Sequence, residues 1–243
     1  MDSATTQEMM RERDPSAAQA TGANSGADWV IAPREYARME SRRGRRHAYQ
    51  QLTPRTTALV VVDMVPFFVD ANPPCLTAAE GIGHLAAQLR HLGGTVAWVV
   101  PSLGEPTSHA IGFYGPDVAA LYAGSGGSGE ARGRIWSGFD IDTDDLVVEK
   151  TASSAFFPGR CDLHLQLMAR GIDTVLITGT VTNVCCESSV RDASTLGYRV
   201  VMVADLNVGG DFATRSATFT VVYRSFGDIR TSSEVSNLLQ RGQ

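Results

Sequence analysis

The stretch that decides the fold runs Val175-Leu-Ile-Thr-Gly-Thr-Val-Thr-Asn-Val-Cys-Cys-Glu-Ser-Ser-Val-Arg-Asp-Ala-Ser-Thr-Leu-Gly197. Its apolar, β-branched start is typical of a buried strand, and the pattern that follows is typical of a helix that ends at Gly197. Cys185 is therefore expected in the first turn of a helix, directly after a strand-to-helix turn. Unpaired N–H groups and the helix dipole favour an anion there, so we predict a lowered thiol pKa and a nucleophilic cysteine. The same N–H groups can stabilise an oxyanion.

Further buried strands are expected on both sides of this stretch, separated by helical patterns. The strands are expected at 57–63, 95–100, 145–149, 198–204 and, as a short edge strand, 228–230. The helices are expected at 76–92, 162–170, 213–225 and 232–239, with one short helix near 117–122 inside the loop-rich segment 102–138. Strands that alternate with helices predict an α/β fold with a parallel sheet.

The composition argues against several classes of protein. The formal net charge of −5 argues against a nucleic-acid binder, which usually carries a basic excess. No apolar run approaches the ~20 residues that span a bilayer, and residues 1–27 lack the apolar core of a signal peptide. The four cysteines show no CxxC spacing, so neither a disulfide scaffold nor a structural zinc site is expected. We expect a cytoplasmic protein without a nucleic-acid or membrane partner.

Three parts of the chain differ in composition. Residues 1–27 are polar and rich in small side chains, and are expected to form a disordered tail. Residues 28–52 include Trp29 and are expected to form an arm that packs on the core or on a neighbouring subunit, with 53–243 as the main domain. The cluster Arg42-Arg43-Gly44-Arg45-Arg46 could bind an acidic partner or nucleic acid, or could be a solvated face or an intersubunit salt-bridge partner.

Three reactive side chains fall at the ends of expected strands. Asp63 and Lys150 each follow an apolar run, and Cys185 follows another. Ligand sites of parallel sheets lie beyond the carboxyl ends of the strands, so these side chains should meet. A Cys185 thiolate could attack an amide or ester carbonyl, with Asp63 as base and later acid, and with Lys150 keeping the carboxylate ionised. Taken singly, a buried small cysteine, a turn-capping aspartate and a surface lysine are the alternatives, and Cys186 is expected to be structural.

Three motifs resemble the isochorismatase-like cysteine hydrolases: Ala58-Leu-Val-Val-Val-Asp63-Met64, Val147-Val-Glu-Lys150 with Ser154-Ala-Phe156, and Gly179-Thr-Val-Thr-Asn-Val-Cys185-Cys-Glu-Ser-Ser-Val-Arg-Asp-Ala193. The resemblance implies a three-layer αβα fold around a six-stranded, mostly parallel sheet, and a homodimer or homotetramer. It implies a catalytic triad of Asp63, Lys150 and Cys185. It also implies an oxyanion hole made by the backbone N–H groups of Val181 and Cys185, and a non-proline cis peptide at Thr180–Val181.

Departures from the family pattern bear on the substrate. Many members continue the first motif with Gln-Asn-Asp-Phe, whereas this chain has Val65-Pro66-Phe67-Phe68. The polar wall of the substrate pocket is therefore expected to be replaced by apolar and aromatic side chains. Metal-dependent nicotinamidases place Asp-x-His…His after the second strand. Here this region holds His109 without an aspartate partner, so neither a metal nor another cofactor is expected. Members that cleave the vinyl ether of isochorismate tend to lack the cysteine, so Cys185 favours C–N cleavage.

The sequence therefore predicts a hydrolase that cleaves a C–N bond of a small amide, ureido compound or lactam through an acyl-enzyme on Cys185. The signature is nearest to ureidoacrylate and N-carbamoyl amidohydrolases, and streptothricin hydrolase, which opens an antibiotic lactam, is one candidate. A vinyl-ether hydrolase that uses Asp63 as general acid, and a binding protein that keeps a degenerate site, are the alternatives. The substrate is expected to contact Phe68, Trp98, Phe156, Phe157 and Thr182.

Overall fold

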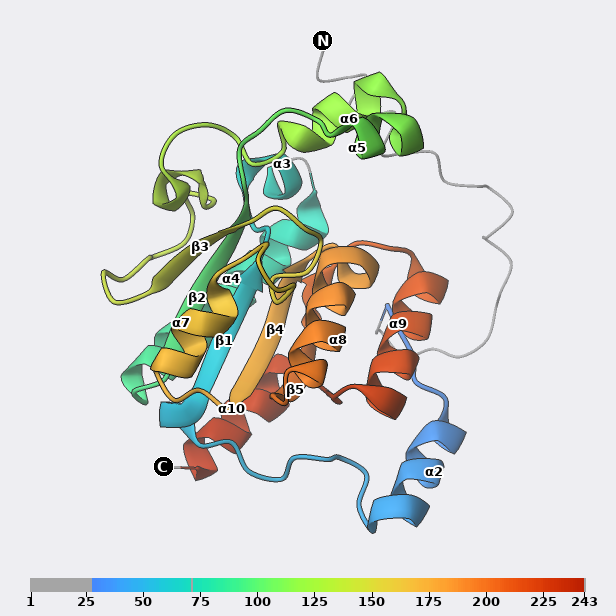
Figure 1. Ribbon diagram of the computed structural model, residues 1–243. Coiled ribbons are helices and arrows are strands. Elements are labelled where there is room, and N and C mark those ends of the chain that lie inside the picture. The colour runs from blue at the N-terminus through green and yellow to red at the C-terminus, as the bar shows by residue number, and fades with distance from the viewer. Residues whose placement is uncertain (1–27, 71, 243) are drawn as a thin grey trace.

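The computed structural model describes residues 28–70 and 72–242, with a six-stranded sheet at the centre (Figure 1). The strand order is β3-β2-β1-β4-β5-β6, and every neighbouring pair is parallel. The predicted α/β fold is confirmed. The strands are β1 (Thr57–Val62), β2 (Thr95–Pro101), β3 (Leu146–Lys150), β4 (Thr174–Thr180), β5 (Arg199–Val208) and β6 (Asp228–Arg230).

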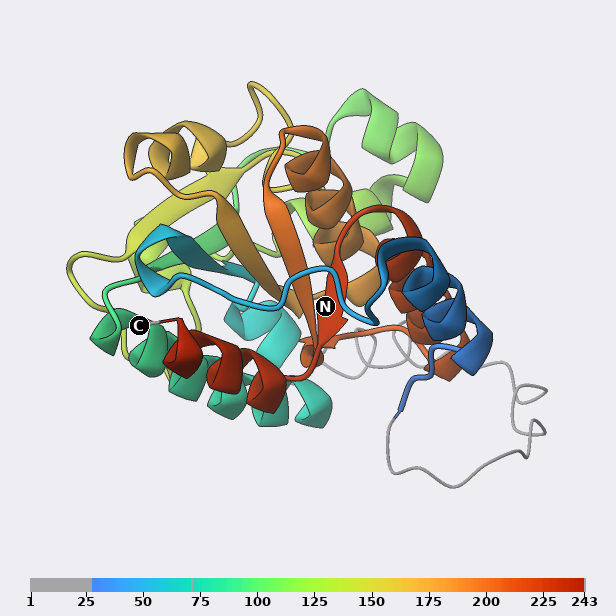
Figure 2. The same cartoon turned by 90° about the horizontal axis from the view of Figure 1, so that it is seen from below.

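Helices cover both faces of the sheet, because strands such as β1 bury every residue and present apolar side chains to both sides. On one face, α4 (Pro73–His91) and α10 (Ser232–Arg241) lie side by side, as Figure 2 shows. The other face is covered by α7 (Leu163–Ala169), α8 (Glu187–Thr195) and α9 (Phe212–Ser225). Each face has its own cluster of buried side chains, which gives the expected three layers.

Strand β5 is longer than the sequence predicts and ends at Val208 instead of Ala204. Its pairing with β4 shifts register between Ile177 and Gly179. The side-chain Nδ2 of Asn207 donates to the carbonyl of Ile177 at 2.9 Å and to that of Val203 at 2.7 Å. The carbonyls of Ile177 and Val203 lie beside the register shift, and the Asn207 side chain gives each of them a hydrogen-bond donor. Strand β5 can therefore continue beyond the shift to Val208.

The segment 102–138 contains more helix than the sequence predicts. It holds α5 (Ser108–Tyr114), α6 (Pro116–Ala123) and the 3-10 helix η3 (Ala131–Arg134). The first of these is seven residues long and buries no residue, so it lacks the buried apolar face by which longer helices are predicted. A cap marks it instead, because the Thr107 hydroxyl accepts the N–H of Ala110 at 3.1 Å.

Residues 28–52 lie against α9 and β6 of the same chain. Helix α2 (Pro33–Arg43) packs beside α9, and Trp29 meets Phe219 edge to face with ring centroids 5.2 Å apart (Figure 1). Farther along, His47 Nδ1 lies 3.0 Å from Oδ1 of the buried Asp228. The 3-10 turn η2 (Pro54–Thr56) then leads into β1. The predicted disordered tail, 1–27, lies outside the described residues. Within the described ranges, no helix has the length and apolar character needed to cross a bilayer.

Candidate active site

The three predicted catalytic side chains come together at the carboxyl edge of the sheet. Asp63 follows β1, Lys150 ends β3, and Cys185 lies just after β4. Lys150 Nζ lies 2.8 Å from Asp63 Oδ2 and 3.6 Å from Cys185 Sγ. The same nitrogen donates to the carbonyl of Ala152 at 3.2 Å. All three ammonium protons therefore have an acceptor, and the long lysine side chain bridges strands that β2 separates.

Asp63 reaches this position through a sharp turn of the backbone. Its φ of 54° lies in the left-handed region, which aspartate adopts more readily than most residues with a side chain. Its N–H still donates to the carbonyl of Val99 at 2.9 Å, so the backbone turns without losing its bond to β2. The side chain is buried and faces Lys150.

The Cys185 thiol stands on a π-helical turn, η4 (Thr182–Cys186), which joins β4 to α8. The peptide bond Thr180–Val181 that precedes the turn is cis, at the position that the resemblance implies. The carbonyl of Val181 accepts the N–H of Cys186 at 3.2 Å. The turn thus places Cys185 directly beyond the end of the strand, as the sequence predicts.

The two adjacent cysteines have different surroundings. Cys186 is fully buried, and its sulfur lies 3.9 Å from the carbonyl oxygen of Thr178, as expected for a structural residue. Cys185 keeps partial exposure and lies beside Lys150, whose Nζ is 3.6 Å from its sulfur.

A serine that the sequence analysis overlooked holds the cysteine turn to a neighbouring loop. The hydroxyl of Ser189 donates to the carbonyl of Cys185 at 2.6 Å and accepts the N–H of Ala155 at 2.9 Å. It thereby ties the loop after β3 to the start of α8. A small polar residue four positions after the cysteine, on the same helix face, is the signal that could have revealed it.

Two glycines allow close backbone contacts around the site. A Cβ on Gly179, whose φ is +112°, would lie 2.1 Å from the carbonyl oxygen of Val62. A Cβ on Gly209, whose φ is +95°, would lie 2.6 Å from Cγ1 of Val181. Glycine alone fits both positions. Neither was identified from the sequence, although a glycine inside a strand pattern is a sign of close approach.

The thiol pKa contradicts the sequence-based prediction. Burial raises the pKa of Cys185 to about 12, the Asp63 carboxylate raises it as well, and Lys150 and the backbone of Val181 act in the opposite direction. The prediction of a lowered pKa was wrong because a helix start stabilises a thiolate only if it outweighs the loss of hydration.

The charged partners of the thiol are shifted too. Burial raises the pKa of Asp63, although Lys150 opposes the shift. Burial alone would lower the pKa of Lys150, but the charges of Asp63 and Cys185 raise it. Asp63 Oδ2 pairs with the lysine, whereas Oδ1 is buried and receives no hydrogen bond of good geometry within the described residues. Oδ1 is therefore placed to take a proton.

The variant Asp63→Asn should make Cys185 more reactive towards iodoacetamide. The carboxylate raises the thiol pKa and Lys150 lowers it, so removing the negative charge leaves the effect of the lysine and the pKa falls. The measurement is the alkylation rate of Cys185 from about pH 7 to about pH 10, followed by intact mass. We expect faster alkylation of the variant at neutral pH, and a wild-type rate that rises across the whole range. Equal rates in wild type, Asp63→Asn and the control Asp173→Asn would contradict this account of the thiol.

Two of the five residues expected to contact substrate belong to the core. Trp98 and Phe156 are each 1% exposed. The indole N–H of Trp98 donates to the carboxylate of Asp145 at 2.7 Å. Asp145 directly precedes β3, so the indole N–H points towards the amino end of that strand and away from the carboxyl edge of the sheet, where Cys185 lies. Phe156 packs on Tyr198, which precedes β5. Both aromatic side chains are therefore packed into the apolar layers, Trp98 from β2 and Phe156 from the loop after β3, and they present almost no surface to a ligand.

The other three remain candidates. Phe157 is 51% exposed in the loop after β3. Phe68 is partly buried on the short helix α3 (Pro66–Val69). Its ring meets that of Phe67 edge to face, with the ring centroids 4.8 Å apart. Thr182 is fully buried, and its hydroxyl has no hydrogen-bond partner within the described part of the chain. Over the same residues, no three or more His, Cys, Asp and Glu side chains form a group suited to a metal ion.

The sequence of residues 57–234 matches the protein-family model of the Isochorismatase domain. The chain belongs to the isochorismatase family. Among relatives, the ureidoacrylate amidohydrolase RutB of Agrobacterium fabrum is 36% identical over 99 residues, which span 40% of this chain and 42% of that protein. The match therefore covers less than half of the length of this family relative.

Solved structures share the fold. A cysteine hydrolase from Pseudomonas syringae pv. phaseolicola superposes with a TM-score of 0.70 at 24% identity, over 81% of this chain and 98% of that one. The N-carbamoylsarcosine amidase from Thermoplasma acidophilum superposes with a TM-score of 0.59 at 26% identity, over 73% of this chain and 96% of that one. The resemblance to isochorismatase-like hydrolases is thus confirmed for both sequence and fold.

Proposed function

We propose that this isochorismatase-family protein hydrolyses a C–N bond of a small amide, ureido compound or lactam through an acyl-enzyme on Cys185. One observation carries the proposal: Lys150 Nζ contacts both Asp63 Oδ2, at 2.8 Å, and Cys185 Sγ, at 3.6 Å. A nucleophile, a proton acceptor and a cation within mutual reach suit covalent amide hydrolysis. The names of the amidohydrolase and amidase relatives support a C–N bond as the target.

In the first half-reaction, Cys185 Sγ bonds to the substrate carbonyl carbon while the thiol proton moves to Asp63 Oδ1. A thiol pKa of about 12 and a raised carboxyl pKa fit a proton that stays on sulfur until attack. The backbone N–H groups of Val181 and Cys185 stabilise the oxyanion. Asp63 then gives the proton to the leaving nitrogen, the C–N bond breaks, and an S-acyl enzyme remains.

In the second half-reaction, water attacks the thioester carbon and gives a proton to Asp63. The C–S bond breaks, the carboxylic or carbamic acid leaves, and the proton on Asp63 returns to the sulfur. Lys150 stays protonated throughout, because its charge stabilises the carboxylate each time that it becomes ionised.

A substrate panel tests the proposal. Ureido acids, primary amides and lactams, including a streptothricin-type lactam, are each incubated with the protein, and product amine or ammonia is measured. We expect turnover within at least one of these classes, with Phe157→Ala and Phe68→Ala raising KM for the best substrate. A panel without turnover, together with hydrolysis of an isochorismate-like vinyl ether, would replace the proposal by the alternative below.

One observation favours a second candidate, a vinyl-ether hydrolase. Burial raises the pKa of Asp63, which is the change needed by a general acid that protonates a carbon. This reaction forms no bond to Cys185, so it would survive replacement of the cysteine. The thiol in contact with Lys150 would then have no role, and for this reason C–N hydrolysis is the better-supported function.

A further inference from the structure

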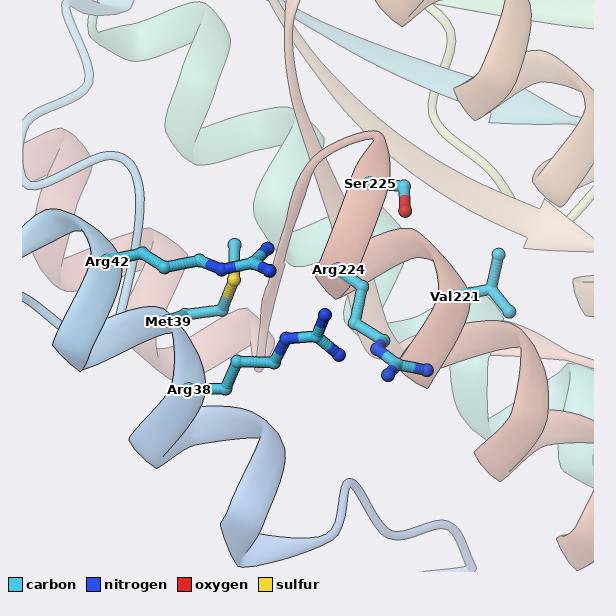
Figure 3. Close-up of a pocket in the computed structure, with 6 residues that line it drawn as sticks. All are labelled: Arg38, Met39, Arg42, Val221, Arg224 and Ser225. Atoms are coloured by element: carbon cyan, nitrogen blue, oxygen red, sulfur yellow. The ribbon is translucent and has the colours of Figure 1, made fainter.

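A hollow lies between α2 and the C-terminal end of α9. Its volume is about 240 Å³, and its lining combines guanidinium groups with small or apolar side chains: Arg38, Met39, Arg42, Val221, Arg224 and Ser225. Figure 3 shows Arg38 and Arg42 extending from α2 towards α9. Because α9 starts after the carboxyl end of β5 and ends just before β6, the hollow lies at the amino edge of the sheet, opposite the cysteine.

Positive charge exceeds negative charge in this hollow. Arg224 Nε pairs with Oε2 of the buried Glu35 at 2.9 Å. Within residues 28–70 and 72–242, no ion pair or side-chain hydrogen bond engages the guanidinium of Arg38 or Arg42. Arg38 and Arg42 are exposed and lie four residues apart on α2, where like charges repel, so an anion bound between them would relieve this repulsion.

Other members of the arginine-rich segment are used to fold the arm. Arg43 Nε donates to the carbonyl of Arg45 at 3.1 Å, and its guanidinium lies 5.4 Å from the ring centroid of Tyr223. The guanidinium of Arg46 lies 3.7 Å from the ring centroid of Tyr36. The predicted arginine cluster therefore divides into side chains that hold the arm and Arg42, which faces the hollow together with Arg38.

We propose that this hollow binds a small, multiply charged oxyanion that carries phosphate or carboxylate groups. The planar guanidinium of arginine donates paired hydrogen bonds that match both groups, and the Ser225 hydroxyl adds a further donor. Met39 and Val221 offer an apolar wall to a carbon skeleton. The ligand would occupy a site separate from Cys185, so the inference does not depend on the proposed hydrolytic reaction.

Isothermal titration calorimetry tests this site by measuring the affinity and stoichiometry of two probes, inorganic pyrophosphate and citrate. The full chain is titrated with each probe at constant ionic strength. We expect one-to-one binding of at least one probe, and the tighter of the two identifies the phosphate or carboxylate source. The double variant Arg38→Gln/Arg42→Gln should weaken binding at least about tenfold, since two guanidinium contacts are lost. Glutamine keeps a helix propensity close to that of arginine, so α2 should remain folded.

The matched control is Arg170→Gln/Arg241→Gln, which removes the same charge from the ends of α7 and α10. It should bind the probe as the wild type does. Equal affinity in the wild type and in Arg38→Gln/Arg42→Gln would overturn the proposal, as would equal weakening in the control. Absence of binding in the wild type with tight binding of duplex DNA would also overturn it, in favour of a nucleic-acid surface.

Discussion

Replacing Cys185 with alanine is expected to reduce kcat by roughly 10⁴-fold or more, because loss of the attacking atom removes the whole covalent route. The measurement is steady-state turnover of the best substrate found in the panel. KM should change much less than kcat, since the partly exposed thiol forms one edge of the site and its removal leaves the remaining walls in place.

Cys186→Ala provides the control for this experiment. It removes the adjacent sulfur, which is fully buried and lies 3.9 Å from the carbonyl oxygen of Thr178. We expect it to keep most of the turnover and to lose about 1 kcal/mol of stability through the small cavity. If Cys185→Ala kept the wild-type rate on this substrate, the covalent route through Cys185 would be refuted.

Replacing Lys150 with methionine is expected to impair both folding stability and turnover. The lysine is the cation that faces the buried Asp63 carboxylate at 2.8 Å. Removing one member of a buried ion pair leaves the other as an unpaired buried charge or forces it to take up a proton, and either outcome lowers stability, by about 3–5 kcal/mol. Urea denaturation should show this loss. Turnover should fall by about 10²-fold or more, because Asp63 then holds its proton and no longer accepts one from the thiol.

The double variant Asp63→Asn/Lys150→Met separates the two effects. Neutralising the carboxylate removes the unpaired acidic group, so most of the lost stability should return, while turnover stays at least as low as in Lys150→Met. Stability that stays as low in the double variant as in Lys150→Met would mean that the lysine acts through packing of its side chain and not through its charge.

The parts of the site that lie at strand ends could be predicted from the sequence. The apolar runs before Asp63, Lys150 and Cys185 identify buried parallel strands, whose carboxyl ends must meet at one edge. The distances of 2.8 Å and 3.6 Å from Lys150 Nζ agree with that reasoning. Local pattern and topology together were enough to bring these side chains to one place.

What the sequence could not provide was the environment of each side chain. The helix start argues for an acidic thiol, but the depth of Cys185 and the charge of Asp63 outweigh it, and both depend on the complete fold. Trp98 looks like a pocket aromatic until its indole is seen to reach Asp145 at the other end of β3. The contacts of Ser189 likewise depend on the path of a loop that no periodic pattern predicts.

The most direct test of the central claim is to trap the acyl-enzyme. The protein is mixed with its best amide, ureido or lactam substrate, quenched in acid within the first turnovers, and analysed by intact mass and by peptide mapping. The account predicts a mass increase equal to the acyl group, located on Cys185 and absent from Cys185→Ala. Turnover that proceeds at the wild-type rate with no adduct on Cys185, or with the adduct on another residue, would contradict it.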